Sequence, residues 1–202
     1  MLWDLLTRGG VLIYPIGLCS LVTVAVFIER LWHLQKSRII PETFTKRIES
    51  LIVDGRVSDA LLLCQESSNP MANVFSAALS QKSLQRAEIK ELVEETGKYE
   101  AAQLEKYIEI LGTCAAITPL LGLLGTVIGM MSVFQQVEVN GLGDPSLFAS
   151  GIWQALITTA VGISVAIPAY IFYKYLQGRV DLLLLEMEER ALKLIDKVCA
   201  HP

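Results

Sequence analysis

Three long stretches of this chain carry no charged residue, and they constrain its fold more than any other feature. These charge-free windows cover 20 residues at 9–28, 28 residues at 110–137 and 29 residues at 145–173. A helix needs about 20 mostly apolar residues to cross the hydrocarbon core of a membrane, and one charge at its centre costs at least about 2.5 kcal/mol. The sequence therefore predicts an all-α integral membrane protein with three transmembrane helices. The other interpretation is a soluble protein with three buried core helices.

The three windows divide the chain into six predicted segments. In order these are an N-terminal tail with the first transmembrane helix (1–32), a cytoplasmic helical region (33–108), the second transmembrane helix (109–134), a periplasmic loop (135–149), the third transmembrane helix (150–176) and a cytoplasmic helical tail (177–202). The first window ends in Glu29 and Arg30 rather than in a signal-peptidase site of small residues, so we expect an uncleaved anchor.

Basic residues predict the orientation, because Lys and Arg collect on the cytoplasmic side of a membrane. Arg30, Lys36 and Arg38 follow the first window, Lys174 follows the third, and the segment 135–149 has no Lys or Arg. The sequence thus predicts a multi-pass protein with a periplasmic N-terminus and a cytoplasmic C-terminus.

Helical patterns continue beyond the second and third windows. A charged pattern runs from Ser83 into the second window without a turn signal, and predicts one helix of about 50 residues. The third helix is expected to continue through the Leu182–Leu185 run to about Val198, so both spans extend into the cytoplasm. Helices this long outside the membrane need packing partners, which self-association would supply. Shorter cytoplasmic helices are expected at 43–53, 57–66 and 70–80.

The windows hold none of the chemistry that enzymes use. The four cysteines show no metal-ligand spacing, and there is no phosphate-binding loop, Ser/His/Asp arrangement or basic patch for nucleic acid. We therefore expect no catalysis, cofactor, metal or nucleic acid.

Small residues and threonines form a stripe along each of the last two windows. At 100° per residue, one stripe surrounds Thr126 and the other surrounds Thr159. The members are Ala115, Pro119, Gly122, Thr126 and Gly129 in the first stripe, and Ala155, Thr159, Gly162 and Ala166 in the second. Such stripes indicate either a tight helix interface or a pore wall shared with another helix. We expect helix packing and pore shape to depend on Pro119, Gly122, Gly125, Gly129, Ala155, Gly162, Ala166 and Pro168, although each proline could also be an ordinary membrane proline.

The two windows also contain specific motifs. Residues 119–130 read Pro-x-x-Gly-x-x-Gly-Thr-x-x-Gly-Met, and residues 151–169 read Gly-Ile-x-x-Ala-Leu-x-x-Thr-x-x-Gly-x-x-x-Ala-Ile-Pro-Ala. These runs resemble the two core helices of the ExbB/TolQ/MotA proton-channel family, and length and loop sizes are closest to ExbB or TolQ. The resemblance covers nearly the whole chain.

The resemblance implies a pentamer around a central pore in the bacterial inner membrane. The pore would hold transmembrane helices of an ExbD- or TolR-like single-span partner, and proton flow would power TonB-dependent transport, with a TonB-like protein, or a Tol or gliding process. Thr126 and Thr159 match the pore threonines of the family. Gln154 stands where the ExbB pattern has a glutamate, so a proton-pathway or pore-lining role at Gln154 would not involve proton binding.

The residues of the windows also indicate, independently of the resemblance, that an acidic group would have to come from another chain. No ionisable residue lies in 110–137 or 145–173, whereas a proton pathway through a membrane normally includes one. We expect a partner with an aspartate at the depth of Thr126 and Thr159. The alternatives are a structural membrane scaffold without ion flow, and a small-solute transporter, which would show paired halves that are absent here.

Overall fold

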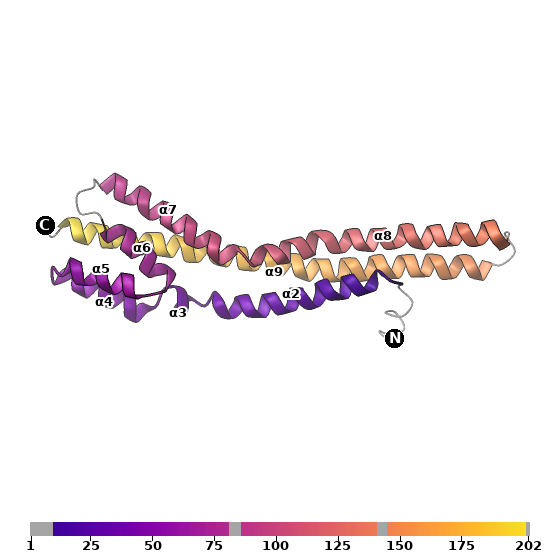
Figure 1. The fold of residues 1–202 in the computed structure, drawn as a ribbon, viewed down its shortest axis with the longest axis horizontal. Coiled ribbons are helices and arrows are strands. Elements are labelled where there is room, and N and C mark those ends of the chain that lie inside the picture. The colour runs from indigo at the N-terminus through magenta and orange to yellow at the C-terminus, as the bar shows by residue number, and fades with distance from the viewer. Residues whose placement is uncertain (1–9, 81–85, 141–144, 201–202) are drawn as a thin grey trace. The chain divides into compact units, whose positions relative to one another are not determined.

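A computed structural model describes residues 10–80, 86–140 and 145–200 (Figure 1). Within these ranges the chain is helical throughout its regular structure and forms no strand. The helices are α2 (Ile13–His33), α3 (Lys36–Ile39), α4 (Glu42–Val53), α5 (Val57–Glu66), α6 (Pro70–Leu79), α7 (Arg86–Glu105), α8 (Ile108–Asn140) and α9 (Pro145–Ala200). The all-α prediction is confirmed, and α9 extends far beyond the third charge-free window, as expected.

Three of these helices are long and apolar enough to cross a membrane: Ile13–His33, Ile108–Glu138 and a stretch of α9 within Ala149–Val198. Their outer faces expose large apolar side chains, which suits contact with lipid or with other membrane helices. On α2 these include Tyr14, Leu18, Leu21, Val24 and Ile28. Three helices that could span a membrane are therefore present, as predicted.

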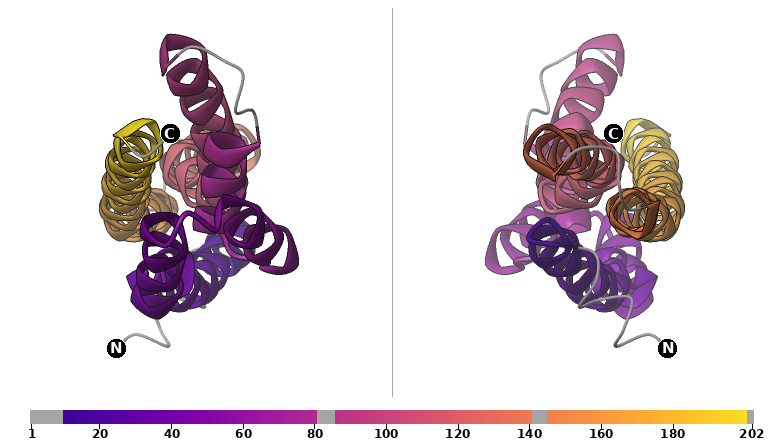
Figure 2. Two further views of the ribbon diagram at one scale, coloured as in Figure 1. Left: turned by 90° about the vertical axis from the view of Figure 1, so that its left-hand side faces the viewer. Right: turned by 90° about the vertical axis from the view of Figure 1, so that its right-hand side faces the viewer.

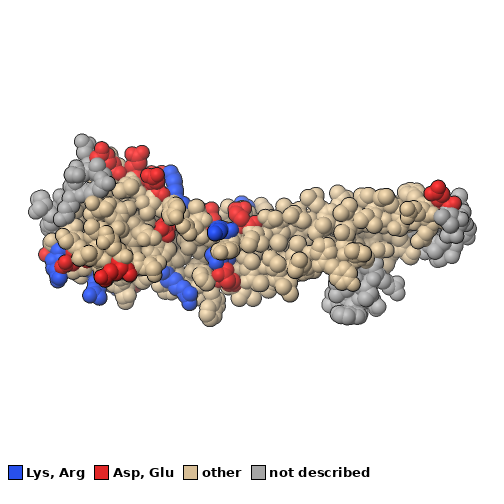
Figure 3. All heavy atoms as spheres, viewed as in Figure 1, with Lys and Arg blue, Asp and Glu red and all other residues tan. Residues whose placement is uncertain are grey.

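The chain divides into two compact units. We call Met1–Glu29 with Tyr107–Tyr175 the apolar unit, and Arg30–Lys106 with Leu176–Pro202 the polar unit. Figure 3 shows the division by charge, because red and blue side chains gather over the helices of the polar unit while the surface of the apolar unit is largely tan.

Helices α8 and α9 run side by side in the apolar unit, as Figure 1 and both views of Figure 2 show. Helix α2 contacts α9 through aromatic rings. Phe27 stacks on Phe172 with ring centroids 3.8 Å apart, and its ring meets Tyr175 at 6.4 Å in an edge-on arrangement.

Local sequence signals explain the short helices of the polar unit. The Asn69 side chain accepts a hydrogen bond from the Ala72 amide at 2.8 Å, and Pro70 occupies the first helical position, so α6 has a strong start. Helix α4 ends at Val53 and is followed by Gly55, whose φ of +74° favours glycine. The Arg56 and Gly55 amides then donate to the carbonyl oxygens of Leu51 and Ile52, which completes a Schellman cap.

Helix α6 lies at the centre of the polar unit. Met71, Val74 and Phe75 on this helix are fully buried, and the Phe75 ring lies 6.3 Å from that of Phe44. The Asn73 amide also donates to the carboxylate of Glu100 in α7 at 2.8 Å.

Ion pairs join distant segments within the polar unit. The pairs and their N–O distances are Lys36–Glu186 at 2.7 Å, Lys197–Glu49 at 2.9 Å and Arg86–Asp196 at 2.7 Å. Because each pair connects residues more than 100 positions apart, the C-terminal half of α9 is part of this unit.

One prediction of helix length is wrong. The expected helix of about 50 residues is broken at Lys106 and Tyr107, between α7 and α8. The break lies where the polar unit meets the apolar unit in the sequence. Neither glycine nor proline marks it, so the sequence gives no local signal for the interruption. The helix α3 was also not predicted.

Candidate functional site

The closest approach between α8 and α9 is made at glycines. A Cβ atom added at Gly162 would lie 2.8 Å from the Thr118 carbonyl oxygen and 3.1 Å from the Gly122 Cα. A Cβ added at Gly122 would lie 3.0 Å from the Thr159 Cα. These neighbours are backbone atoms that cannot rotate away, so the two helices touch main chain to main chain at this level.

The contact between the two helices continues toward the C-terminal end of α8 and the N-terminal end of α9. A Cβ added at Gly129 would lie 3.0 Å from that of Ala155. Gly125 receives the side chain of Thr158, and Gly151 receives that of Val133. Each small residue therefore leaves room for either the backbone or one larger side chain of the other helix. Membrane helices pack closely in this way.

Thr159 forms a hydrogen bond that joins the two helices. Its hydroxyl donates to the carbonyl oxygen of Gly122 at 2.8 Å. Thr126 lies one turn beyond Gly122 on α8, and its hydroxyl donates to the carbonyl oxygen of Leu123 at 2.6 Å. Both threonine side chains are half-buried. The hydroxyls of Thr126 and Thr159 thus bond to the carbonyl oxygens of two consecutive residues of α8. We call these two threonines the threonine pair.

Two further threonines belong to this contact, and the sequence reasoning did not single them out. Thr118 and Thr158 are 0% and 1% exposed, so they are more deeply buried than the threonine pair. Their hydroxyls donate within their own helices, to the carbonyl oxygens of Cys114 and Gln154. The signal for Thr158 was available, because it follows Ala155 by three residues and precedes Gly162 by four.

The Gln154 side chain lies against Gly10, which precedes α2. A Cβ atom added at Gly10 would overlap the Gln154 side-chain amide nitrogen, and Gly10 has a φ of +72°. The half-buried amide therefore packs on the backbone that leads into α2. A role for Gln154 in an ion path stays a prediction.

The two prolines lie inside continuous helices. Pro119 in α8 is half-buried and Pro168 in α9 is exposed. Each proline lacks the amide that would bond to the carbonyl four residues earlier, at Ala115 and at Ser164. Neither helix breaks there, and a role in pore shape stays a prediction.

Other parts of the described chain offer less chemistry. No group of three or more His, Cys, Asp or Glu side chains that could hold a metal ion occurs among the described residues. Cys64 is buried in α5, and this burial raises the pKa of its thiol from 9.0 to about 12, so it is a poor nucleophile.

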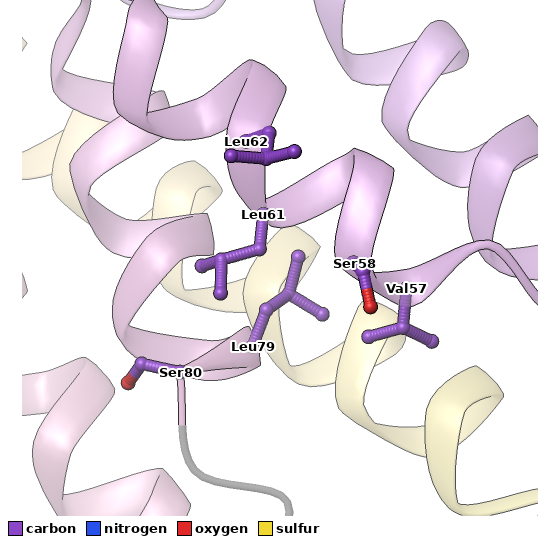
Figure 4. Close-up of a pocket in the computed structure, with 6 residues that line it drawn as sticks. All are labelled: Val57, Ser58, Leu61, Leu62, Leu79 and Ser80. Atoms are coloured by element: carbon purple, nitrogen blue, oxygen red, sulfur yellow. The ribbon is translucent and has the colours of Figure 1, made fainter.

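A hollow of about 510 Å³ lies between α5 and α6. Figure 4 shows its lining of apolar side chains with two serines. The lining residues are Val57, Ser58, Leu61, Leu62, Leu79 and Ser80. None of these described lining residues is an acid, a base or a usual metal ligand, so the α8–α9 contact remains the candidate functional site.

Comparisons with known proteins match a family to the part of the chain that contains this contact. Residues 66–189 match the family described as the MotA/TolQ/ExbB proton channel family. This match includes the whole of α8, the threonine pair and most of α9.

Individual relatives carry the names of this family. The chain is 31% identical over 179 residues to a putative biopolymer transport protein ExbB homolog of Methanothermobacter thermautotrophicus, an alignment of 88% of this chain and 63% of the relative. It is 28% identical over 166 residues to the putative biopolymer transport protein ExbB-like 3 of Synechocystis, with 81% and 79% covered.

A shorter match involves the Tol-Pal system protein TolQ of Haemophilus influenzae. It is 39% identical over 82 residues, or 41% of this chain and 36% of the relative. The chain therefore spans less than two thirds of the Methanothermobacter relative and about a third of this TolQ.

Proposed function

Because the chain belongs to the MotA/TolQ/ExbB proton channel family, a family of channels rather than of enzymes, we propose that it is the channel-forming subunit of an inner-membrane motor. The motor converts proton motive force into mechanical work. The relatives are named for biopolymer transport and for the Tol-Pal system, which supports TonB-dependent transport or a related envelope process as the work performed.

One observation carries this proposal: the α8–α9 contact around Gly122 and Gly162 presents hydroxyls but no Asp, Glu, Lys, Arg or His. Thr126 and Thr159 lie in this contact beside the buried Thr118 and Thr158, and no Asp, Glu, Lys, Arg or His occurs in 110–137 or 145–173. A threonine hydroxyl does not take up a proton near neutral pH. The group that carries the proton must therefore come from another chain.

The partner that fits is an ExbD- or TolR-like protein with a single span and an aspartate inside it. Its helices would lie in a pore made by several copies of this chain, five by analogy with the family. Helix α9 supports self-association, because Leu182 and Leu185 are 69% and 63% exposed although they lie in the polar unit. Apolar side chains exposed in water favour contact with another copy.

The energy source is adequate for such a motor. One elementary charge that crosses 100 mV releases about 2.3 kcal/mol, which is enough to bias a step between equivalent positions in a ring. The basic residues near the first and third spans support a periplasmic N-terminus and a cytoplasmic C-terminus for each copy.

The test is proton flux in vesicles that contain this chain with and without the single-span partner. We expect flux only with both chains, and Thr159→Val should abolish it while native mass spectrometry shows an intact complex. Thr158→Val is the matched control, because it removes a hydroxyl one residue away that donates to the carbonyl oxygen of Gln154 in its own helix. Absence of flux under every condition would instead identify a structural membrane scaffold.

A further inference from the structure

Two cysteines and a threonine meet between α2 and α8 in the apolar unit. The side chain of Cys114 on α8 interacts with the side chains of Cys19 and Thr23 on α2. Both cysteines are free thiols, and all three residues lie inside charge-free windows. None of the three belongs to the threonine pair or takes part in the proposed function.

Helical spacing turns these side chains toward each other. Cys19, Thr23 and Phe27 follow at intervals of four residues, so they lie on one face of α2. This face packs inward, because Thr23 is 3% exposed and the Phe27 ring stacks on that of Phe172 in α9 at 3.8 Å. Cys114 is 8% exposed, so it belongs to the buried face of α8.

The two thiols differ in how they can be reached. Cys19 is half-buried, and its neighbour Leu18 is 63% exposed on the outer face of α2. Cys114 is buried. A reagent dissolved in lipid should therefore react first with Cys19, and the Cys114 thiol lies behind it.

Thr23 adds a hydroxyl group to the two thiols. Its oxygen is buried and has no assigned hydrogen-bond partner among the residues that the structure describes. The neutral thiol beside it is only a weak donor and a weak acceptor. The hydroxyl can donate a much stronger hydrogen bond to a sulfur that carries negative charge, and such a sulfur forms during thiol–disulfide exchange.

We propose that Cys19 and Cys114 form an oxidisable thiol pair, and that a lipid-soluble disulfide converts them into a disulfide bond that links α2 to α8. This inference goes beyond the proposed function and does not depend on proton flow. Because the two side chains already interact, rotation about side-chain bonds is the movement needed to join the sulfur atoms. The product carries no charge, so it suits a position inside a membrane.

The reaction consists of two exchanges. The Cys19 thiol loses its proton, and its sulfur attacks the reagent disulfide, which forms a mixed disulfide on Cys19 and releases one thiol. The Cys114 thiol then loses its proton, and its sulfur attacks the Cys19 sulfur and displaces the second thiol. Two cysteines are oxidised, the reagent is reduced to two thiols, and these take up the two protons. The Thr23 hydroxyl stabilises the Cys114 sulfur while it is charged.

The experiment treats the full chain in liposomes with dithiodipyridine, a membrane-permeant disulfide that releases thiopyridone. Every sample carries Cys199→Ala, so that this cysteine adds nothing to the signal. We expect two thiopyridones per chain and a Cys19–Cys114 peptide in non-reducing mass spectrometry. Cys114→Ser should release one thiopyridone and keep the adduct on Cys19, and Cys19→Ser should leave Cys114 unmodified. Cys64 is buried in α5 and should stay unmodified throughout.

Thr23→Val tests the role of the hydroxyl. It should slow the second exchange about tenfold, the effect of one hydrogen bond to a charged group, and leave the first exchange unchanged. Thr113→Val is the matched control. The Thr113 hydroxyl is next to Cys114 in the sequence, but it is exposed and donates to the carbonyl oxygen of Glu109 at 2.9 Å, so its loss should change neither rate.

A mixed disulfide that persists on Cys19 overturns the inference, because it shows that the Cys114 sulfur does not reach it. Absence of a Cys19–Cys114 peptide after complete reaction of Cys19 has the same meaning. Both results come from the chain with the two cysteines and Thr23 intact, so a variant that fails to fold does not leave the question open. A wild-type rate of the second exchange in Thr23→Val would overturn the role given to the hydroxyl.

Discussion

The two compact units hold their helices together by different means. In the apolar unit, α8 and α9 meet through glycines and a threonine hydroxyl on a carbonyl. In the polar unit, large side chains such as Phe75, Met71 and Ile48 are fully buried, and ion pairs join distant segments.

The difference follows from the solvent that each unit is built for. Water drives large apolar side chains together, by about 25 cal/mol for each Å² removed from it. Lipid is as apolar as leucine, so membrane helices associate through close packing and hydrogen bonds. The apolar unit therefore carries its polar oxygens in a close helix contact, and the proposed function would place a partner helix beside them.

Phe75→Ala should have the largest effect, because it removes a fully buried ring from the centre of the polar unit. We expect a loss of about 3–5 kcal/mol in the free energy of unfolding. Hydrogen exchange followed by mass spectrometry in detergent should show faster exchange in 30–106, with 107–175 still protected. Equal loss of protection in both units would show that they unfold together, which contradicts the claim that each unit is stabilised by its own interactions.

Much of the fold could be predicted from the sequence, because local signals decide it. The helix predicted at 57–66 is Val57–Glu66 in the structure, and those predicted at 43–53 and 70–80 differ from α4 and α6 by one residue at an end. Caps and turns at Gly55 and Asn69 set these limits. The break at Lys106 and Tyr107 could not be predicted, since it depends on tertiary packing rather than on a local turn signal.

The candidate site could be predicted in part. The glycines at 122 and 162 were expected in a close contact because of their spacing, and the structure places both against backbone atoms. Thr158 was overlooked because helical spacing alone did not decide which of two adjacent threonines is buried. The hydrogen bond from Thr159 to the Gly122 carbonyl oxygen could not be predicted, because it depends on how α8 and α9 pack in the folded chain.

Gly162→Ala tests the close contact of the apolar unit. Its Cβ would lie 2.8 Å from the Thr118 carbonyl oxygen, so α8 and α9 must move apart at a cost of about 1–3 kcal/mol. The measurement is the melting temperature in detergent. Gly17→Ala in α2 is the control, since nothing lies within 4 Å of its added Cβ, and it should stabilise the chain by up to about 1 kcal/mol. Equal effects of the two changes would mean that the contact adds nothing.

Cys64 gives a pH-dependent test of burial in the polar unit. Because the pKa of its thiol is raised from 9.0 to about 12, the folded chain resists ionisation that the unfolded chain allows. This contribution to stability is complete below pH 9 and is lost as the pH rises toward 12, by about 1.4 kcal/mol for each pH unit. The fall in melting temperature between pH 8 and pH 10 should therefore be smaller in Cys64→Ala than in the wild type. Identical falls would show that the thiol is accessible to water.

Glu186→Gln should have the smallest effect. It tests how much ion pairs add to apolar burial in the polar unit. Glu186 pairs with Lys36 and Arg190, both at 2.7 Å, and its side chain is 27% exposed. We expect a loss of up to about 1 kcal/mol that shrinks in high salt, because ion pairs near water are screened. Glu189→Gln is the matched control three residues further along α9, where the pair with Lys193 is 62% and 68% exposed, and its melting temperature should not change measurably. A loss at Glu186 as large as that of Phe75→Ala would mean that charge rather than apolar burial holds the polar unit together.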